Sequence, residues 1–271
     1  MRTVLRSETR TVVIGPDQPF CIIGERINPT GRTRFQHELR QGDLSRIDID
    51  VAEQVAGGAM VLDVNMGTPL GGEVALMTRA VTRIRDRTDL PLCIDSSVIE
   101  VLEAGLTAYQ GKALVNSVNA SDARLAAILP LVKTYGAAVI ALTNDEEEEI
   151  PTEPARRLEL ARKIVDVATG RYGIDPEDIV LDPLATPIGA DPASVARTLE
   201  AIALITAELA VNTTLGASNV SFGRPEREDI VSAFLPKAMA AGLTSAIMDA
   251  RSPGLVRSAR AADLLLGRGP R

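Results

Sequence analysis

The chain of 271 residues contains few side chains that bind soft metals or form crosslinks. Cys21 and Cys93 are its only cysteines, and His37 is its only histidine. Two cysteines cannot form a disulfide framework, and these three side chains are too few for the usual structural zinc site. A Ser-His-Asp arrangement is also disfavoured, because His37 stands alone in a charged segment that is typical of a solvated helix or loop. We therefore expect no bound metal and a reducing, cytoplasmic compartment.

Aromatic residues and long apolar runs are scarce as well. Aromatics make up 3% of the chain, without any tryptophan, whereas hydrophobic residues make up 45%. The core must therefore consist mainly of Ala, Val, Ile and Leu, as in many α/β proteins. No segment reaches the ~18 consecutive apolar residues of a membrane span. A formal net charge of −7 provides no general attraction to nucleic acid or to an anionic membrane, so we expect neither as a partner.

Short apolar runs and amphipathic segments alternate eight times after a polar start. The predicted strands are 20–24, 59–65, 92–95, 113–116, 137–144, 179–182, a seventh that runs into Ser218 and Asn219, and 244–249. The predicted helices are 44–56, 73–85, 98–106, 122–134, 154–168, 192–205, 227–241 and 255–266. Because repeated strand–helix units require parallel strands with right-handed crossovers, eight of them predict a (β/α)8 barrel, the TIM barrel. An open doubly wound sheet is the alternative, but the first strand lacks a following Gly-x-Gly-x-x-Gly motif.

We expect a single domain over residues 1–271, in which residues 1–19 form an N-terminal extension. The C-terminal ends of barrel strands open onto one face, which carries the active site of TIM-barrel enzymes. Every predicted strand ends in, or is followed by, polar side chains. These are Glu25, Asn28, Asp63, Asn65, Asp95, Asn116, Asn119, Thr143, Asn144, Asp182, Ser218, Asn219 and Asp249.

A helix cap explains any one of these polar residues equally well, but eight similar strand ends predict a ring around one cavity mouth. One carboxylate per strand is a poor arrangement for a hard cation, whose ligands cluster at close spacing. Carboxylates and amides suit a neutral heterocycle that is rich in N–H donors and carbonyl acceptors. Pterin and purine rings are of this kind.

Two segments have alternative interpretations. Residues 215–225 carry small and polar groups where a core strand would carry branched apolar residues, and Gly216 allows a close approach of the backbone to a ligand. An ordinary turn is the alternative there. The acidic run 145–149 is typical of a solvated loop, with a docking surface as the alternative.

Six short motifs follow one another along the chain. They are GERIN at 24–28, LDVNMG at 62–67, CIDS at 93–96, VNSVNA at 115–120, LDPL at 181–184 and GASNVSFG at 216–223. In this order they resemble the motifs of the pterin-binding methyltransferases. That family includes the methyltetrahydrofolate:corrinoid protein methyltransferases and the folate domain of cobalamin-dependent methionine synthase. The resemblance runs from near residue 20 to near residue 250 and so covers most of the chain.

The resemblance implies that Asp95, Asn116 and Asp182 hold the pterin ring of tetrahydrofolate or 5-methyltetrahydrofolate. It implies that Asn219 is catalytic and contacts N5, the nitrogen that carries the methyl group. Because a tertiary amine is a poor leaving group, a hydrogen bond that strengthens at N5 in the transition state would assist transfer. The other residues implied for the folate site are Gly216, Ser218, Glu25, Asn28, Asp63, Asn65 and Arg227.

The same resemblance implies that cobalamin arrives on a separate corrinoid protein, which docks over the same barrel face, and that the chain forms a homodimer. Phe222 departs from the acetogen-type enzymes, which carry an amide there, so a second hydrogen bond near N5 is not expected from this position. Dihydropteroate synthase is the nearest enzymatic alternative. It needs charge for a pyrophosphate leaving group, and segments 29–32 and 218–221 contain no lysine. A non-catalytic folate-binding protein is the alternative from another class.

Overall fold

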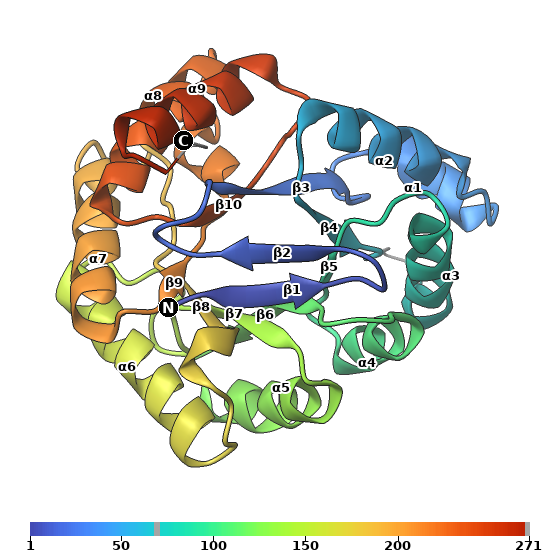
Figure 1. Ribbon diagram of the computed structural model, residues 1–271, viewed down its shortest axis with the longest axis horizontal. Coiled ribbons are helices and arrows are strands. Elements are labelled where there is room, and N and C mark those ends of the chain that lie inside the picture. The colour runs from blue at the N-terminus through green and yellow to red at the C-terminus, as the bar shows by residue number, and fades with distance from the viewer. Residues whose placement is uncertain (68–70, 269–271) are drawn as a thin grey trace.

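Eight parallel strands form the centre of the fold in the computed structural model, which describes residues 1–67 and 71–268 (Figure 1). Their order in the sheet is β10-β3-β4-β5-β6-β7-β8-β9. The strands are β3 (Cys21–Ile27), β4 (Val61–Asn65), β5 (Leu92–Asp95), β6 (Leu114–Asn119), β7 (Ala138–Leu142), β8 (Ile179–Asp182), β9 (Asn212–Thr213) and β10 (Ser245–Met248). Near-continuous apolar runs form most of these strands, because both faces of a parallel sheet are buried.

Backbone hydrogen bonds close this sheet into a barrel between its two end strands. The N–H of Ile247 donates to the carbonyl oxygen of Leu215 at 2.9 Å, and the N–H of Thr244 donates to that of Thr213 at 3.3 Å. The predicted (β/α)8 barrel is therefore confirmed.

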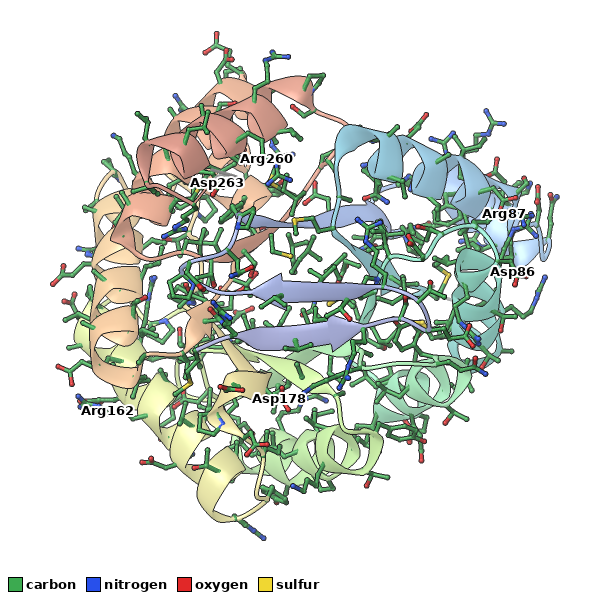
Figure 2. The ribbon with its side chains drawn as sticks, viewed as in Figure 1. Asp86, Arg87, Arg162, Asp178, Arg260 and Asp263 are labelled. Carbon is green, nitrogen blue, oxygen red and sulfur yellow. The ribbon has the colours of Figure 1, made fainter. Side chains whose placement is uncertain are left out.

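Helices surround the barrel as an outer ring (Figure 1). They are α2 (Ser45–Gly57), α3 (Glu73–Arg85), α4 (Ile99–Ala108), α5 (Asp122–Tyr135), α6 (Pro154–Gly170), α7 (Ser194–Leu209), α8 (Arg227–Ala241) and α9 (Pro253–Leu265). An additional helix, α1 (Thr33–Arg40), contains the exposed His37. Side chains such as Arg87 and Arg162 lie on the outside of the ring (Figure 2). Within the described ranges, no helix combines the length and apolar character needed to cross a bilayer.

Residues 1–19 are more than a polar extension, because they form a hairpin across the N-terminal end of the barrel. Its strands are β1 (Thr3–Arg6) and β2 (Thr11–Ile14), which pair antiparallel. Leu5, Val12 and Ile14 are buried in one cluster with inward-facing residues of β3 to β8. This floor leaves the C-terminal strand ends as the open end of the barrel, which is where the site was predicted.

The predicted course of the seventh strand is wrong. β9 ends at Thr213, and the chain then turns into a 3-10 helix, η2 (Ala217–Ser221), so Ser218 and Asn219 lie on a helical turn. A hydroxyl group here satisfies a local backbone carbonyl instead of the backbone continuing a ladder. The hydroxyl of Ser221 donates to the carbonyl oxygen of Ser218 at 3.1 Å.

Candidate functional site

The ends of β4, β5 and β6 bring four of the predicted residues together. The strand register places Asn65 beside Asp95, and Asp95 beside Asn116. The Asn65 amide donates to Asp95 Oδ2 at 2.9 Å, and the Asn116 amide donates to Asp63 Oδ1 at 3.1 Å. Asp95 and Asn116 also line a cavity of about 280 Å³. That volume is just below the lower end of typical ligand pockets, so it suits a small ring more than an extended ligand.

Burial controls the ionisation of the two carboxyls in this group. It raises the pKa of Asp63 well above its usual range, and the neighbouring Asp95 carboxylate raises it further. Burial also raises the pKa of Asp95 to about 6, against the opposing hydrogen bond from Asn65. A ligand that donates N–H groups to these carboxyls would stabilise their ionised form. The pair is therefore suited to hydrogen-bonding a ring with amide and amino groups.

Asp182 lies at the end of β8 and is buried. Its Oδ1 accepts a hydrogen bond from the N–H of Leu184 at 2.7 Å. Burial raises the pKa of Asp182 to about 7, while the Leu184 N–H and the Arg157 guanidinium oppose this rise. Near neutral pH this carboxyl can therefore exist in either charge state.

Arg157 is a residue of this region that the sequence interpretation missed. It lies on α6 and is 1% exposed. Its guanidinium donates to the carbonyl oxygens of Pro151, Pro183 and Leu184 at 2.8, 2.8 and 2.9 Å. A signal was present in the sequence, because Arg157 is four residues before the buried Ala161 and so lies in the apolar stripe of its helix.

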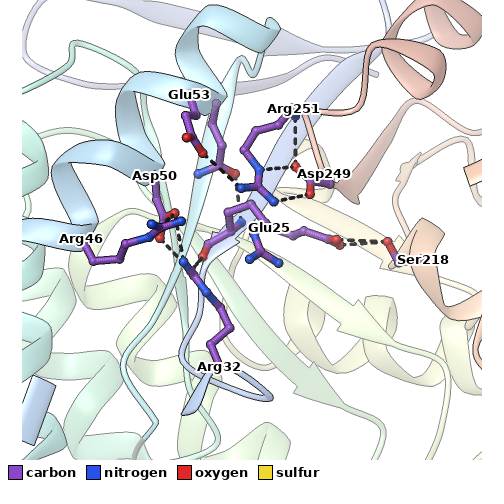
Figure 3. A network of polar contacts seen from close by, with 10 residues as sticks. Glu25, Arg32, Arg46, Asp50, Glu53, Ser218, Asp249 and Arg251 are labelled. Carbon is purple, nitrogen blue, oxygen red and sulfur yellow. Dashed lines mark hydrogen bonds and ion pairs between the residues drawn. The ribbon is translucent and has the colours of Figure 1, made fainter. Parts of the chain in front are cut away.

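Ser218 connects η2 to the end of β3 (Figure 3). Its hydroxyl donates to Glu25 Oε1 and Oε2 at 3.1 and 3.2 Å. Burial raises the pKa of Glu25, and this hydrogen bond opposes the rise. Arg227 donates to the carbonyl oxygen of Ser218 at 2.9 Å and to Ser221 Oγ at 3.2 Å. Glu25 and Arg227 thus hold η2 from two sides.

Asn219 is exposed on η2 at the open end of the barrel. Among the described residues, its side-chain amide has no hydrogen-bond partner. A Cβ atom added to Gly216 would lie 2.9 Å from Asn219 Nδ2, so glycine provides the space for this amide. Phe222 follows η2 and is 67% exposed.

The Asn28 side chain makes a local contact instead of bonding to another strand end. Its Oδ1 accepts a hydrogen bond from the N–H of Thr30 at 2.9 Å and so forms a local turn. Asp249 is paired with Arg251, whose guanidinium donates to it at 2.8 and 2.9 Å (Figure 3). Burial favours a higher pKa for Asp249, but the bonds from Arg251 outweigh it and the pKa is lowered.

The contacts of the polar residues bear on two other roles for them, helix capping and metal binding, and on the acidic run 145–149. At the N-terminus of α9, Ser252 Oγ accepts a capping hydrogen bond from the N–H of Leu255, but Ser252 is not one of the ring residues. In the described structure, helices α2 to α8 have no such side-chain cap. Helix capping therefore does not explain the ring. No group of three or more His, Cys, Asp or Glu side chains in the described ranges is arranged to hold a metal ion. In the acidic run, Asp145 pairs with Arg156 at 2.8 Å.

A larger cavity, of about 610 Å³, lies at the opposite ends of the strands beside Pro19, Met60 and Leu90. It is mainly apolar, and its Asp263 carboxylate already accepts hydrogen bonds from the N–H of Phe20. We place the site at the smaller cavity because it is lined by Asp95, whose pKa is raised, and by the amides of Asn116 and Asn119, and because Asn116 connects it to Asp63.

Comparison with known proteins identifies a family and two similar curated proteins. The model for "Pterin binding enzyme" matches residues 24–249. The chain is 35% identical to the methionine synthases of Mycobacterium tuberculosis over 247 residues and of Mycobacterium leprae over 242 residues. These matches cover 86% and 84% of this chain but 21% and 20% of the synthases, so the chain spans about a fifth of their length.

Similar solved structures include the dihydropteroate synthase of Xanthomonas albilineans in complex with 7,8-dihydropteroate, at a TM-score of 0.72 and 20% identity. The Yersinia pestis dihydropteroate synthase has a TM-score of 0.70 and 14% identity. Each comparison covers 98% of this chain and 100% of the other. At these identities, the likeness shows a shared fold.

Proposed function

The chain belongs to the pterin binding enzyme family, and from this premise we propose that it transfers a methyl group between N5 of tetrahydrofolate and the cobalt of a corrinoid. The observation that carries the proposal is the free Asn219 amide, presented on η2 at the rim of a ring of buried and half-buried carboxylates and amides. The 35% identity to two methionine synthases supports methyl transfer in particular.

The polar residues fit the head group of a folate. Asp63, Asp95 and Asp182 would accept hydrogen bonds from the ring N–H and amino groups, and the Asn116 amide can both donate and accept. In the described part of the chain, the buried oxygens Asn144 Oδ1 and Thr214 Oγ1 have no hydrogen-bond partner. Buried polar atoms usually have one, so these oxygens agree with a polar occupant at this end of the barrel.

Asn219 would act at N5 in this arrangement. Its amide would donate a hydrogen bond to N5 that strengthens as negative charge develops there, while solvent supplies the proton. Gly216 leaves room for the amide, and the contacts of Ser218 with Glu25 and Arg227 fix the turn that presents it. A reduced corrinoid supplies the nucleophile for the methyl group.

We further propose that the corrinoid is carried by a separate protein that docks on the open end of the barrel. The exposure of Asn219 and Phe222 leaves this rim accessible to such a partner. Action in the cytoplasm and assembly as a homodimer belong to the same proposal. Methyl flow in either direction is compatible with the site.

Ligand choice tests the proposal against dihydropteroate synthesis. Calorimetry should detect binding of 5-methyltetrahydrofolate, and incubation with free cob(I)alamin should yield tetrahydrofolate. The same protein should form no dihydropteroate from 7,8-dihydropterin pyrophosphate and 4-aminobenzoate, because 218–221 offers no lysine for the leaving pyrophosphate. Dihydropteroate formation without methyl transfer would replace the proposal by the alternative. Tight folate binding without either reaction would indicate a binding protein.

A further inference from the structure

We propose that Arg157 is a positioning residue for Asp182: from outside the barrel wall, it holds the loop after β8 and supplies the counter-charge for the Asp182 carboxylate. The effect of Arg157 on folate binding rests on the proposed function. The effects of Arg157 on the pKa of Asp182 and on the loop can be measured in the protein without ligand.

The Arg157 guanidinium makes three hydrogen bonds to the loops at this end of the barrel. All three acceptors are backbone carbonyl oxygens, and two of them, Pro183 and Leu184, directly follow Asp182. Leu184 has a φ of 64°, which a residue with a Cβ seldom adopts. This conformation belongs to the residue whose N–H donates to Asp182 Oδ1. Arg157 therefore anchors the backbone that holds the carboxylate.

The charge of Arg157 acts on Asp182 as well. A guanidinium stays protonated at neutral pH, and its five donors suit several carbonyl acceptors at once. Because carbonyl oxygens carry no net charge, they do not neutralise the guanidinium. Its positive charge therefore still attracts the Asp182 carboxylate. In agreement, Arg157 opposes the burial that raises the pKa of Asp182.

Within residues 1–67 and 71–268, few other charged groups lie around Arg157 and Asp182. Directly after β7, the Thr143 hydroxyl donates to the carbonyl oxygen of Asp182, and β9 contributes Asn212 and Thr213 beside β8. None of these three side chains titrates near neutral pH. Arg197 on α7 lies near Arg157 but is paired with Asp191. Arg157 is thus the charged group to which the state of Asp182 should respond.

Two variants separate the charge from the geometry. Arg157→Gln keeps hydrogen-bond donors without the charge, and Arg157→Lys keeps the charge without the guanidinium fork. Arg162→Gln is the matched control, because Arg162 lies on the same helix and pairs with Glu208 on the outer surface at 2.7 Å. The titration of Asp182 would be followed by NMR in ¹³C-aspartate-labelled protein without ligand, with Asp182→Asn for assignment.

We expect Arg157→Gln to raise the pKa of Asp182 by about 1, the low end of the effect of a nearby opposite charge. Arg162→Gln should leave this pKa unchanged. Arg157→Lys should keep it near the wild-type value but increase hydrogen exchange at the Leu184 amide, because fewer carbonyls are held. Folded Arg157→Gln protein in which Asp182 titrates as in wild type would overturn the inference.

Should Arg157→Gln fail to fold, the exchange measurement on Arg157→Lys decides instead, and a Leu184 amide protected as in wild type would overturn the inference. These readouts need no ligand. If wild-type protein binds no 5-methyltetrahydrofolate, only the proposed function fails. If it does bind, Arg157→Lys should weaken binding about tenfold, equivalent to about 1.4 kcal/mol, while Arg162→Gln should not.

Discussion

At the scale of single residues, ionisation is the property of the site that burial changes most. Asp63, Asp95 and Asp182 all have raised pKa values, mainly because the barrel end removes them from water. Each is an ordinary aspartate in the sequence, and nothing in its neighbours along the chain predicts the shift. Residue type and strand-end position predicted where these groups lie, but their ionisation depends on three-dimensional packing.

Asp182 should make folate binding depend on pH. Its pKa in the free protein is raised to about 7, and N–H donors of the ligand favour the ionised carboxylate, so the pKa of the complex is lower. Binding therefore releases a proton below about pH 7 and should strengthen from pH 6 to pH 8, by up to about tenfold per pH unit, before it levels off. Calorimetry with 5-methyltetrahydrofolate would measure this profile.

Asp95 should extend the dependence of affinity to lower pH, because its pKa is raised to about 6. Asp182→Asn is the control, since it removes the contribution of the Asp182 carboxyl, whose pKa is raised to about 7. Affinity that falls from pH 6 to pH 8 in wild-type protein would contradict the assigned role of Asp182.

At the scale of elements, η2 is the part of the site whose conformation matters most. The prediction had the seventh strand run into Ser218 and Asn219, because a strand is expected after the helix 192–205 in the alternation of strands and helices. The actual turn depends on contacts with residues distant in the sequence, such as Glu25, and on the fit between Gly216 and Asn219. Composition marked this segment as unusual but could not predict its backbone.

Gly216→Ala tests whether the η2 turn presents the Asn219 amide in the position proposed for catalysis. The added Cβ would meet Asn219 Nδ2 at 2.9 Å, so the amide must move by several tenths of an ångström. We expect the rate of methyl transfer to fall about tenfold or more, because catalytic hydrogen bonds depend on such placement, while thermal unfolding changes little. Single-turnover kinetics would measure the rate.

Gly170→Ala is the matched control for this change, because a Cβ at Gly170 meets no heavy atom within 4 Å. Its transfer rate should equal that of wild type. A Gly216→Ala protein with the wild-type rate would show that the close fit of Gly216 and Asn219 is not needed.

At the scale of the whole molecule, the barrel itself could be predicted from the sequence. Its parallel strands and covering helices depend on local apolar patterns, and right-handed crossovers leave few ways to connect them. The hairpin floor could not be predicted, because its role depends on Leu5 and Ile14 meeting inward-facing residues of distant strands. The position of Arg157 in the apolar stripe of α6 indicated its burial, but its role could not be predicted, since its acceptors are backbone carbonyls that the fold alone brings near.

In the proposed methyl transfer, the barrel, the polar ring at its open end and Asn219 act together. The most direct test is single-turnover transfer from 5-methyltetrahydrofolate to free cob(I)alamin, followed by the absorbance change of the corrinoid, in wild type and Asn219→Ala. We expect transfer by wild type and a rate about 100-fold lower in the variant, as for loss of one transition-state hydrogen bond, with folate binding changed only modestly. Absence of transfer by wild type would refute the proposed methyl transfer, and equal rates in the two proteins would refute the proposed role of Asn219.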